Sequence, residues 1–428
     1  MEQSANDYFT GLLKKELICA MGCTEPAAAA LAGAAARVEL GLKPEQIRIR
    51  ASRDIIKNAM HVGIPNSTLK GISAAVALGI AVGDPSESLS ILANTSKSQE
   101  DEARAFLSGG MIKLDLAEAV PPIFIEVELE ARGKTACARV EHEHHNVKIF
   151  KNGKKTASST RAENNSPENS FLTLARIHEY SENIPLEEIA FLIKAAETNL
   201  SIAEHSMKTG YGIGVGPAMA AGENNNTLEY FFRKGSSLAA AASDARMAGC
   251  AMPVVINSGS GNQGITISVP VLVLARGLNA GDEETARSLC LAHLTALMIT
   301  SRKDRLSALC GAFTASIGTA VGFIRLLKGS EEDMNNIVDN MVANLIGIIC
   351  DGAKGSCAMK IYSCVQAAAM STKIVLAGRS VSRAEGIVGE NMDNNLTYIQ
   401  RISHDGMAPL DRVVLDIMLE KGNRAVQG

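Results

Sequence analysis

Three cysteines in the second half of the chain have the types and spacing that could bind a metal cluster. Cys350 and Cys357 flank the run Asp-Gly-Ala-Lys-Gly-Ser, whose glycines let the backbone approach a bound group closely. Cys310 lies in an earlier segment, Ser-Ala-Leu-Cys-Gly. Soft thiolate ligands from two segments, set among small residues, are what an iron–sulfur cluster with an open iron requires. The alternative is that these cysteines are buried thiols that serve as small hydrophobic side chains.

A further cysteine, Cys23, lies where a helix is predicted to begin. Thr24 can cap this helix, Pro26 suits its first turn, and the alanine-rich run 27–38 continues it. The helix dipole and the free N–H groups at this end would favour a thiolate and lower the pKa of Cys23. Cys23 is therefore a candidate reactive thiol, with a buried, inert thiol as the alternative. Cys19 is expected to lie on the preceding helix and to serve packing.

Two glycine-rich loops interrupt the later, mainly apolar part of the chain. The loop 256–265 reads Ile-Asn-Ser-Gly-Ser-Gly-Asn-Gln-Gly-Ile and joins two apolar runs. Small residues expose its backbone N–H groups, which suits a carboxylate, and the candidate binding residues are Ser258, Ser260, Gly261 and Asn262. The loop 209–217 has a Gly-x-Gly-x-Gly spacing but no surrounding βαβ unit, so it is predicted to be structural rather than dinucleotide-binding.

Composition limits the classes of protein to which the chain can belong. Its 428 residues are 46% hydrophobic and 21% charged, which is typical of a globular protein with two domains. A net charge of -4, no tryptophan and no basic run argue against a nucleic-acid partner. No apolar run is long enough to span a membrane. The nine cysteines are scattered and no secretion signal precedes them, so we expect reduced thiols or metal ligands in a cytoplasmic protein.

Hydrophobic periodicity predicts an α+β fold, in which a small mixed α/β part with a sheet precedes a larger, mainly helical part. The helical pattern predicts helices over 8–17 and 69–82. Alternation of apolar and polar residues predicts strands over 46–52, 123–129, 134–143 and 146–151. A polar stretch, 156–170, is the candidate linker. Beyond it the pattern predicts the helices 171–180, 185–205, 227–250, 284–299, 302–327, 331–349 and 358–377. We therefore expect a mixed α/β domain over 1–160 that contributes Cys23, and a helical catalytic domain over 165–428.

One polar segment of the first domain, 141–145, has residue types that could bind a metal ion. Residues 141–145 read Glu-His-Glu-His-His, but alternation on a strand would spread His142, His144 and His145 over both faces. This favours a solvated edge or turn over a metal site. Residues 57–66 are predicted to form a loop.

The cysteine segments and the serine–glycine loop together resemble the L-cysteine desulfidase family, which is related to the α chain of bacterial iron–sulfur L-serine dehydratases. The motifs with the highest specificity are Met247 with 253–265, the segment 307–311, and Cys350-Asp-Gly-Ala-Lys with Cys357-Ala-Met-Lys. Supporting matches lie at 22–26, 57–58 with 62–65, and 406–407. The resemblance therefore extends over nearly the whole chain.

The resemblance implies a [4Fe–4S] cluster with one iron open to substrate, held by Cys310, Cys350 and Cys357. It also implies that Cys23 is the catalytic base. Asn58 joins the loop residues as a substrate-binding candidate. Lys354 and Lys360 could neutralise cluster or substrate charge, or they could be exposed loop lysines.

The implied reaction is β-elimination from a small amino acid, in which L-cysteine gives pyruvate, ammonia and sulfide through 2-aminoacrylate. L-serine dehydration on the same cluster is an alternative. A pyridoxal-phosphate lyase is another, because Ser-Gly-Asn-x-Gly also occurs in such enzymes and Lys234 could carry the cofactor. A non-enzymatic thiol–metal sensor would need a closed, four-ligand site. A homodimer is one option for the oligomeric state.

Overall fold

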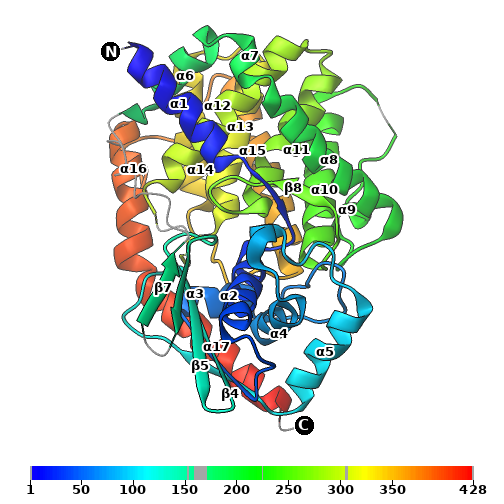
Figure 1. Ribbon diagram of the computed structural model, residues 1–428. Coiled ribbons are helices and arrows are strands. Elements are labelled where there is room, and N and C mark those ends of the chain that lie inside the picture. The colour runs from blue at the N-terminus through cyan, green and yellow to red at the C-terminus, as the bar shows by residue number, and fades with distance from the viewer. Residues whose placement is uncertain (1, 152–153, 159–170, 224, 304–306, 427–428) are drawn as a thin grey trace.

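Two hydrophobic cores organise the chain, one beside a mixed sheet and one inside a larger helical assembly (Figure 1). The computed structural model describes residues 2–151, 154–158, 171–223, 225–303 and 307–426. The expected α+β class is confirmed, with the sheet in the N-terminal part and the larger helical part after it. The predicted domain boundary falls in 159–170, outside the described residues, so the two-domain division stays a prediction.

The sheet has six strands in the order β3-β2-β4-β5-β6-β7. Only β2 and β3 pair in parallel among these strands. The bounds are β2 Gln46–Ala51, β3 Ile112–Leu116, β4 Phe124–Ala131, β5 Lys134–Glu141, β6 Val147–Lys151 and β7 Lys154–Ser158. All four predicted strands are present, whereas β3 and β7 were not predicted. β7 takes up the first residues of the expected polar linker, because it completes a hairpin with β6.

One face of the sheet is covered by α2 (Thr24–Leu40), and α4 (Ile72–Val82) packs on α2. The alanine-rich run allows this close packing: a β-carbon at Gly79 would lie 2.0 Å from the carbonyl oxygen of Ala30. Leu415 from the C-terminal helix joins the same core. The remaining elements of this part are α3 Arg53–Ala59, the 3₁₀ helix η1 Pro85–Ser90, α5 Lys97–Ser108 and α17 Ala408–Val426.

The helical part forms the other end of the molecule in Figure 1, and the N-terminal helix α1 (Glu2–Glu16) packs with it. Its central helices are α10 Leu228–Met247, α11 Gly261–Gly277, α12 Asp282–Thr300, α13 Gly311–Leu326 and α15 Ser356–Leu376. Around them lie α6 Leu174–Asn183, α7 Leu186–Ile189, α8 Phe191–Thr209, α9 Val215–Ala218, α14 Glu331–Leu345, α16 Met392–Arg401 and the π-helix η3 Ile402–Gly406. No helix in the described part of the chain is long and apolar enough to cross a membrane.

Several predicted helix ends need correction. The predicted helix 302–327 begins only at Gly311, and 331–349 ends at Leu345. In both cases the non-helical residues form the loops that carry Cys310 and Cys350, and an isolated bridge between Leu309 and Ile349 holds those loops together. α11 was not predicted as a helix, although it starts directly at Gly261 of the serine–glycine loop.

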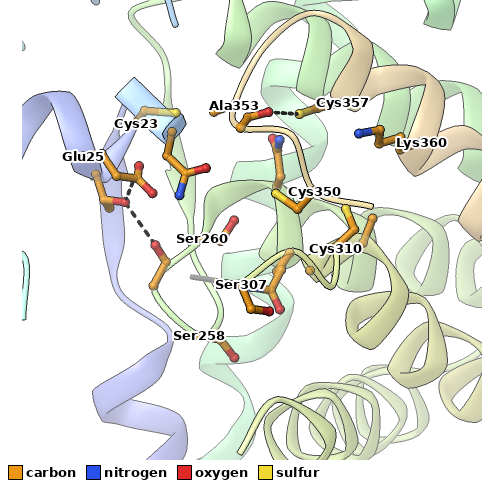
Figure 2. Close-up of a pocket in the computed structure, with 18 of the residues that line it drawn as sticks. Cys23, Glu25, Ser258, Ser260, Ser307, Cys310, Cys350, Ala353, Cys357 and Lys360 are labelled. Carbon is orange, nitrogen blue, oxygen red and sulfur yellow. Dashed lines mark hydrogen bonds between the residues drawn. The ribbon is translucent and has the colours of Figure 1, made fainter. Parts of the chain in front are cut away.

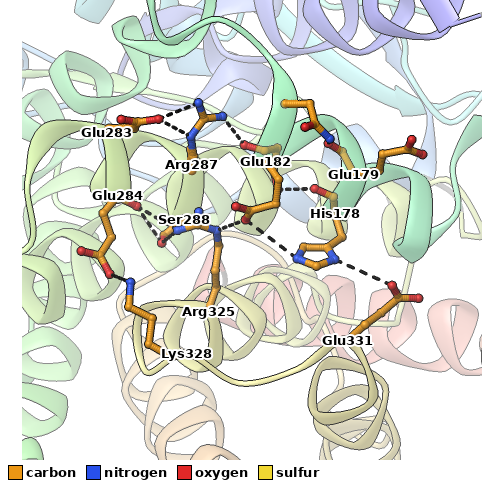
Figure 3. Close-up of polar contacts among 12 residues, drawn as sticks. His178, Glu179, Glu182, Glu283, Glu284, Arg287, Ser288, Arg325, Lys328 and Glu331 are labelled. Atoms are coloured by element: carbon orange, nitrogen blue, oxygen red, sulfur yellow. Dashed lines mark hydrogen bonds and ion pairs between the residues drawn. The ribbon is translucent and has the colours of Figure 1, made fainter.

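A polar network ties α6, α12, α13 and α14 together on the outside of the helical core (Figure 3). Arg325 is its centre: Nε donates to Glu182 at 2.7 Å, and Nη1 donates to the hydroxyl of Ser288 at 2.9 Å. His178 lies between Glu182 and Glu331, 3.8 Å from each carboxylate. None of these residues lines the pocket that contains Cys310, Cys350 and Cys357, and the network is assigned to stability.

Candidate active site

A short two-stranded sheet joins the N-terminal segment to the helical part. β1 (Cys19–Met21) pairs antiparallel with β8 (Pro253–Val255), and the amide of Ile256 donates to the carbonyl of Ile18 at 3.0 Å. Cys19 therefore lies on a strand rather than on the predicted helix, and its side chain is exposed. β1 leads directly to Cys23 and β8 leads directly to the serine–glycine loop, so this pairing brings both to one place.

Cys23 is the N-cap residue of α2, a position that the prediction gave to Thr24. Thr24 is instead the first residue of the helix, and its hydroxyl lies 3.2 Å from both the Glu25 carboxylate and the Gly259 carbonyl oxygen. The start of α2 is thereby fastened to the serine–glycine loop. Ser258 in that loop has a φ of 53°, a left-handed conformation that is uncommon outside glycine and often marks functional loops.

Cys310 and Cys350 are held side by side by their backbones (Figure 2). The amide of Cys310 donates to the Ile348 carbonyl at 3.0 Å, and the amide of Cys350 donates to the Ala308 carbonyl at 2.6 Å. The two thiols lie close enough to shift each other's pKa. Two loops far apart in sequence therefore present a pair of sulfur atoms to one cavity.

Cys357 comes from the first turn of α15, where its thiol lies 3.7 Å from the Gly352 carbonyl oxygen. Gly352 has a φ of 91°, and a β-carbon there would lie 2.1 Å from the backbone carbonyl oxygen of Lys57. Glycine at 352 is needed for both reasons. The cysteine loop therefore rests directly on α3 of the N-terminal part.

One pocket collects most of the residues predicted from sequence: Cys23, Asn58, Ser258, Ser260, Asn262, Cys310, Cys350, Cys357 and Lys360. Two predicted residues are not in its lining. Gly261 packs against the Arg246 side chain, and Lys354 forms an ion pair with Asp351 at 2.7 Å. Lys360 also pairs with Asp351, and it donates to the Ile349 carbonyl at 2.8 Å. Asp351 thus fixes both lysines beside the cysteine loop.

The electrostatic environments of the thiols differ. The neighbouring Cys310 thiol, with support from the charge of Lys57, lowers the pKa of Cys350 to about 5. Burial raises the pKa of Cys23 to about 12, although the charge of Arg246 opposes this. The predicted lowering of the Cys23 pKa is therefore wrong for the ligand-free protein, because desolvation outweighs the helix terminus.

Lys57 and Asn58 lie on α3, not in the predicted loop. Lys57 is 1% exposed and forms ion pairs with Asp54 and with Asp411 of α17. The Lys57 ammonium group also interacts electrostatically with Cys350. The C-terminal helix is thereby connected to the cysteine loop through a single buried lysine.

Some residues that line the pocket were missed by the sequence analysis: Glu25, His144, Arg246, Gln263 and Lys303. His144 does lie in a turn, as predicted, but it is only 7% exposed and is not solvated. Gln263 accepts from Thr314 at 3.1 Å and packs against Gly311, next to Cys310. Glu25, His144 and Gln263 lie in segments that the sequence singled out, whereas Arg246 and Lys303 do not, and all five meet only in the fold.

The alternatives to a thiol-based site find less support. Two backbone amides of the loop 209–217, those of Ile213 and Val215, donate to the buried Asp244 carboxylate at 3.2 Å and 2.7 Å. That loop is therefore structural. Lys234 is exposed on α10, 5.8 Å from the Tyr230 ring, and does not line the pocket, so it is badly placed to carry pyridoxal phosphate.

The donor set fits a cluster better than a single ion. Within the described residues, no three histidine, cysteine or acidic side chains are close enough to hold one metal ion. A cubane cluster makes a different demand, because each cysteine binds a different iron and the sulfur atoms are correspondingly spread. Three thiols around one cavity, two from loops and one from the first turn of α15, meet that demand.

Comparison with known proteins agrees with this chemistry. The profile of the serine dehydratase alpha chain matches residues 86–416. The chain belongs to the serine dehydratase alpha-chain family. A UPF0597 protein of Oleidesulfovibrio alaskensis is 39% identical over 422 residues, covering 96% of this chain and 98% of that protein. The UPF0597 protein of Bacteroides thetaiotaomicron is 37% identical over 427 residues, covering 99% and 100%. This family is generally associated with iron–sulfur clusters, and membership indicates an enzyme of the dehydratase or lyase kind.

Proposed function

We propose that this member of the serine dehydratase alpha-chain family is a [4Fe–4S]-dependent lyase that eliminates sulfide from L-cysteine. The observation that carries the proposal is the pocket in which Cys310, Cys350 and Cys357 meet Cys23 and the serine–glycine loop (Figure 2). Cys310, Cys350 and Cys357 would hold the cluster. When bound, it would supply a Lewis-acidic iron that withdraws electrons from the leaving group.

The other residues of the pocket suit the remaining tasks. Cys23 accepts the α-proton at Sγ, as the general base. The electrons of the broken Cα–H bond form the Cα–Cβ double bond while the Cβ–S bond breaks, so sulfide and 2-aminoacrylate are the products. Tautomerisation and hydrolysis of 2-aminoacrylate then give pyruvate and ammonia without help from the protein. Asn58 and the loop residues Ser258, Ser260 and Asn262 are the polar groups proposed to orient the substrate.

The thiolate that this role requires has physical support in the Arg246 side chain, whose positive charge lowers the pKa of Cys23 against the effect of burial. Cys23 also lies at the N-terminus of α2, where N–H groups favour an anion. Both contacts become more favourable once Cys23 is deprotonated.

L-serine dehydration is the second candidate, and the match to serine dehydratase alpha chains favours it. The two substrates differ only in the leaving group, sulfide or water. The pocket has no feature among its described residues that separates them.

The test is turnover by anaerobically purified protein, with L-cysteine and L-serine as separate substrates. Pyruvate should form together with an equal amount of sulfide from L-cysteine, and activity should be lost in air because an open iron is easily oxidised. Pyruvate from L-serine alone would assign dehydration instead. Activity in colourless protein that depends on added pyridoxal phosphate would overturn both.

A further inference from the structure

The Arg246 side chain is buried in the pocket without a carboxylate partner. It extends from the last turn of α10, is 3% exposed, and lines the same cavity as the cysteines. Its Nε has no hydrogen-bond partner, and within the described residues no acidic side chain forms an ion pair with it. A buried charge is costly unless it is paired. An arginine placed in this way is suited to an anionic ligand.

The guanidinium group lies at the N-terminus of α11. A β-carbon at Gly261, the first residue of this 17-residue helix, would be 2.4 Å from Arg246 Nε and 2.9 Å from Cζ. Ser260 occupies the N-cap position but makes no capping hydrogen bond. The positive end of the helix and the arginine therefore meet at one point, which is a favourable place for a carboxylate.

Glu25 supplies the opposite charge near Cys23. It lies in the first turn of α2, is 8% exposed, and lines the pocket. The hydroxyl of Thr24 donates to it, but no lysine, arginine or histidine in the described part of the chain pairs with it. Figure 2 shows Glu25 beside Cys23, near the serine–glycine loop. A buried carboxylate of this kind is suited to a cationic group.

We propose that Arg246 and Glu25 together recognise the zwitterion of an α-amino acid, Arg246 by binding the carboxylate and Glu25 by binding the ammonium group. The assignment rests on the proposed function, since it names the two residues that bind the substrate of that reaction. It also explains why two buried charges of opposite sign line one pocket without forming an ion pair with each other.

Cys23 lies within reach of both charges, which places it near the α-carbon that bears both substrate groups. The charges of Arg246 and Glu25 both act on Cys23, Arg246 by lowering its pKa and Glu25 by raising it. A guanidinium group has five N–H donors, so Arg246 can contact Cys23 and a carboxylate at the same time. Substrate recognition by Arg246 and Glu25 and proton removal by Cys23 would therefore take place at one point in the pocket.

Two thiols that each lack one charged group test the assignment: 3-mercaptopropionate has the carboxylate, and cysteamine has the ammonium group. Their dissociation constants are measured by anaerobic titration calorimetry on the intact protein, wild type, Arg246→Met and Glu25→Gln. Arg246→Met should weaken 3-mercaptopropionate by about tenfold to a hundredfold and leave cysteamine unchanged. Glu25→Gln should weaken cysteamine by a similar factor and leave 3-mercaptopropionate unchanged.

Arg233→Met is the matched control, because Arg233 is exposed on the same helix and does not line the pocket; it should alter neither constant. Circular dichroism confirms that each variant is folded, and Arg246→Lys, which keeps the charge, replaces Arg246→Met if that variant does not fold. Equal weakening of both probes by each variant, or no weakening by either, would overturn the assignment. Because binding is measured without turnover, failure of the proposed reaction would appear separately, as selective binding without pyruvate formation.

Discussion

The backbone carbonyl of Lys57 lies directly over Gly352, so closely that a β-carbon at residue 352 would stand 2.1 Å from its oxygen. This contact joins the N-terminal part to the cysteine loop between Cys350 and Cys357. It connects the two halves of the pocket at a point where any side chain would push them apart.

Gly352→Ala should therefore damage both stability and the site. Its φ of 91° and the contact with Lys57 are each unfavourable for alanine, so we expect a loss of more than about 1 kcal/mol of folding free energy. Gly355→Ala is the control in the same loop, because its φ is -51° and its nearest neighbour, Ile213 Cγ2, is 3.4 Å away. Thermal unfolding of the two variants checks this, and equal melting temperatures would contradict it.

The sequence predicted the residues of this pocket better than their arrangement. Cys310, Cys350, Cys357 and the serine–glycine loop could be found because small and polar residues interrupt apolar runs there. Arg246 and Glu25 could not, because a charged residue within a helical pattern predicts an exposed side chain unless the partner helix is known. The three-residue strands β1 and β8 were also missed, since so short a segment has no readable period.

The fold shows the same division. Four strands were predicted from alternation, whereas β3 was missed although its sequence, Ile-Lys-Leu-Asp-Leu, alternates as clearly. α11 contains Pro270 and reads as an apolar run, so its helical state depends on burial within the helical core. The high pKa of Cys23 likewise follows from tertiary burial, which a local argument from the helix terminus cannot include.

Cys23→Ala separates the base from the cluster ligands. If Cys23 removes the α-proton, this variant should keep its iron and lose turnover by about 100- to 10,000-fold. Exchange of α-deuterium from solvent into the substrate is the measurement, made on protein with an intact cluster. Exchange at the wild-type rate would exclude Cys23 as the base. A changed iron spectrum before substrate is added would instead make Cys23 a resting ligand.

In cluster-free protein, Cys350 should be the thiol that reacts first at neutral pH. Its pKa is lowered to about 5 by the neighbouring Cys310 thiol and the charge of Lys57, so we expect a thiolate above that pH. Burial raises the pKa of Cys19, which is nevertheless exposed and serves as the comparison. Iodoacetamide labelling followed by mass spectrometry at pH 6 should find Cys350 modified and Cys19 unmodified. Modification of Cys19 but not of Cys350 would show that Cys350 is not a thiolate at pH 6.

The network in Figure 3 should contribute pH-dependent stability. Burial raises the pKa of Glu182, but the hydrogen bond from Arg325 and the positive charges around the carboxylate together outweigh this and lower the pKa. A carboxyl with a lowered pKa stabilises the fold above its unfolded pKa, about 4.3 for glutamate, and loses this contribution as pH falls through the folded value. Glu182→Gln should therefore cost about 1 kcal/mol or less at pH 7, because Glu182 is 41% exposed and solvent screens it.

Arg325→Met should cost more, about 1.5–3 kcal/mol, because this side chain is 11% exposed and also donates to Ser288 and to the Glu284 carbonyl. Denaturant unfolding at pH 7 and at low pH measures both variants. The difference between wild type and Glu182→Gln should fade at low pH, and a difference independent of pH would contradict the assigned role of the ion pair.

The most direct measurement is the iron and acid-labile sulfide content of anaerobically purified protein. We expect brown protein with about four iron and four sulfide per chain. We also expect Cys310→Ser, Cys350→Ser and Cys357→Ser each to lose the cluster, whereas Cys250→Ser and Cys364→Ser keep it. Colourless wild-type protein that still forms pyruvate, or full iron content after replacement of any of the three proposed ligands, would contradict it.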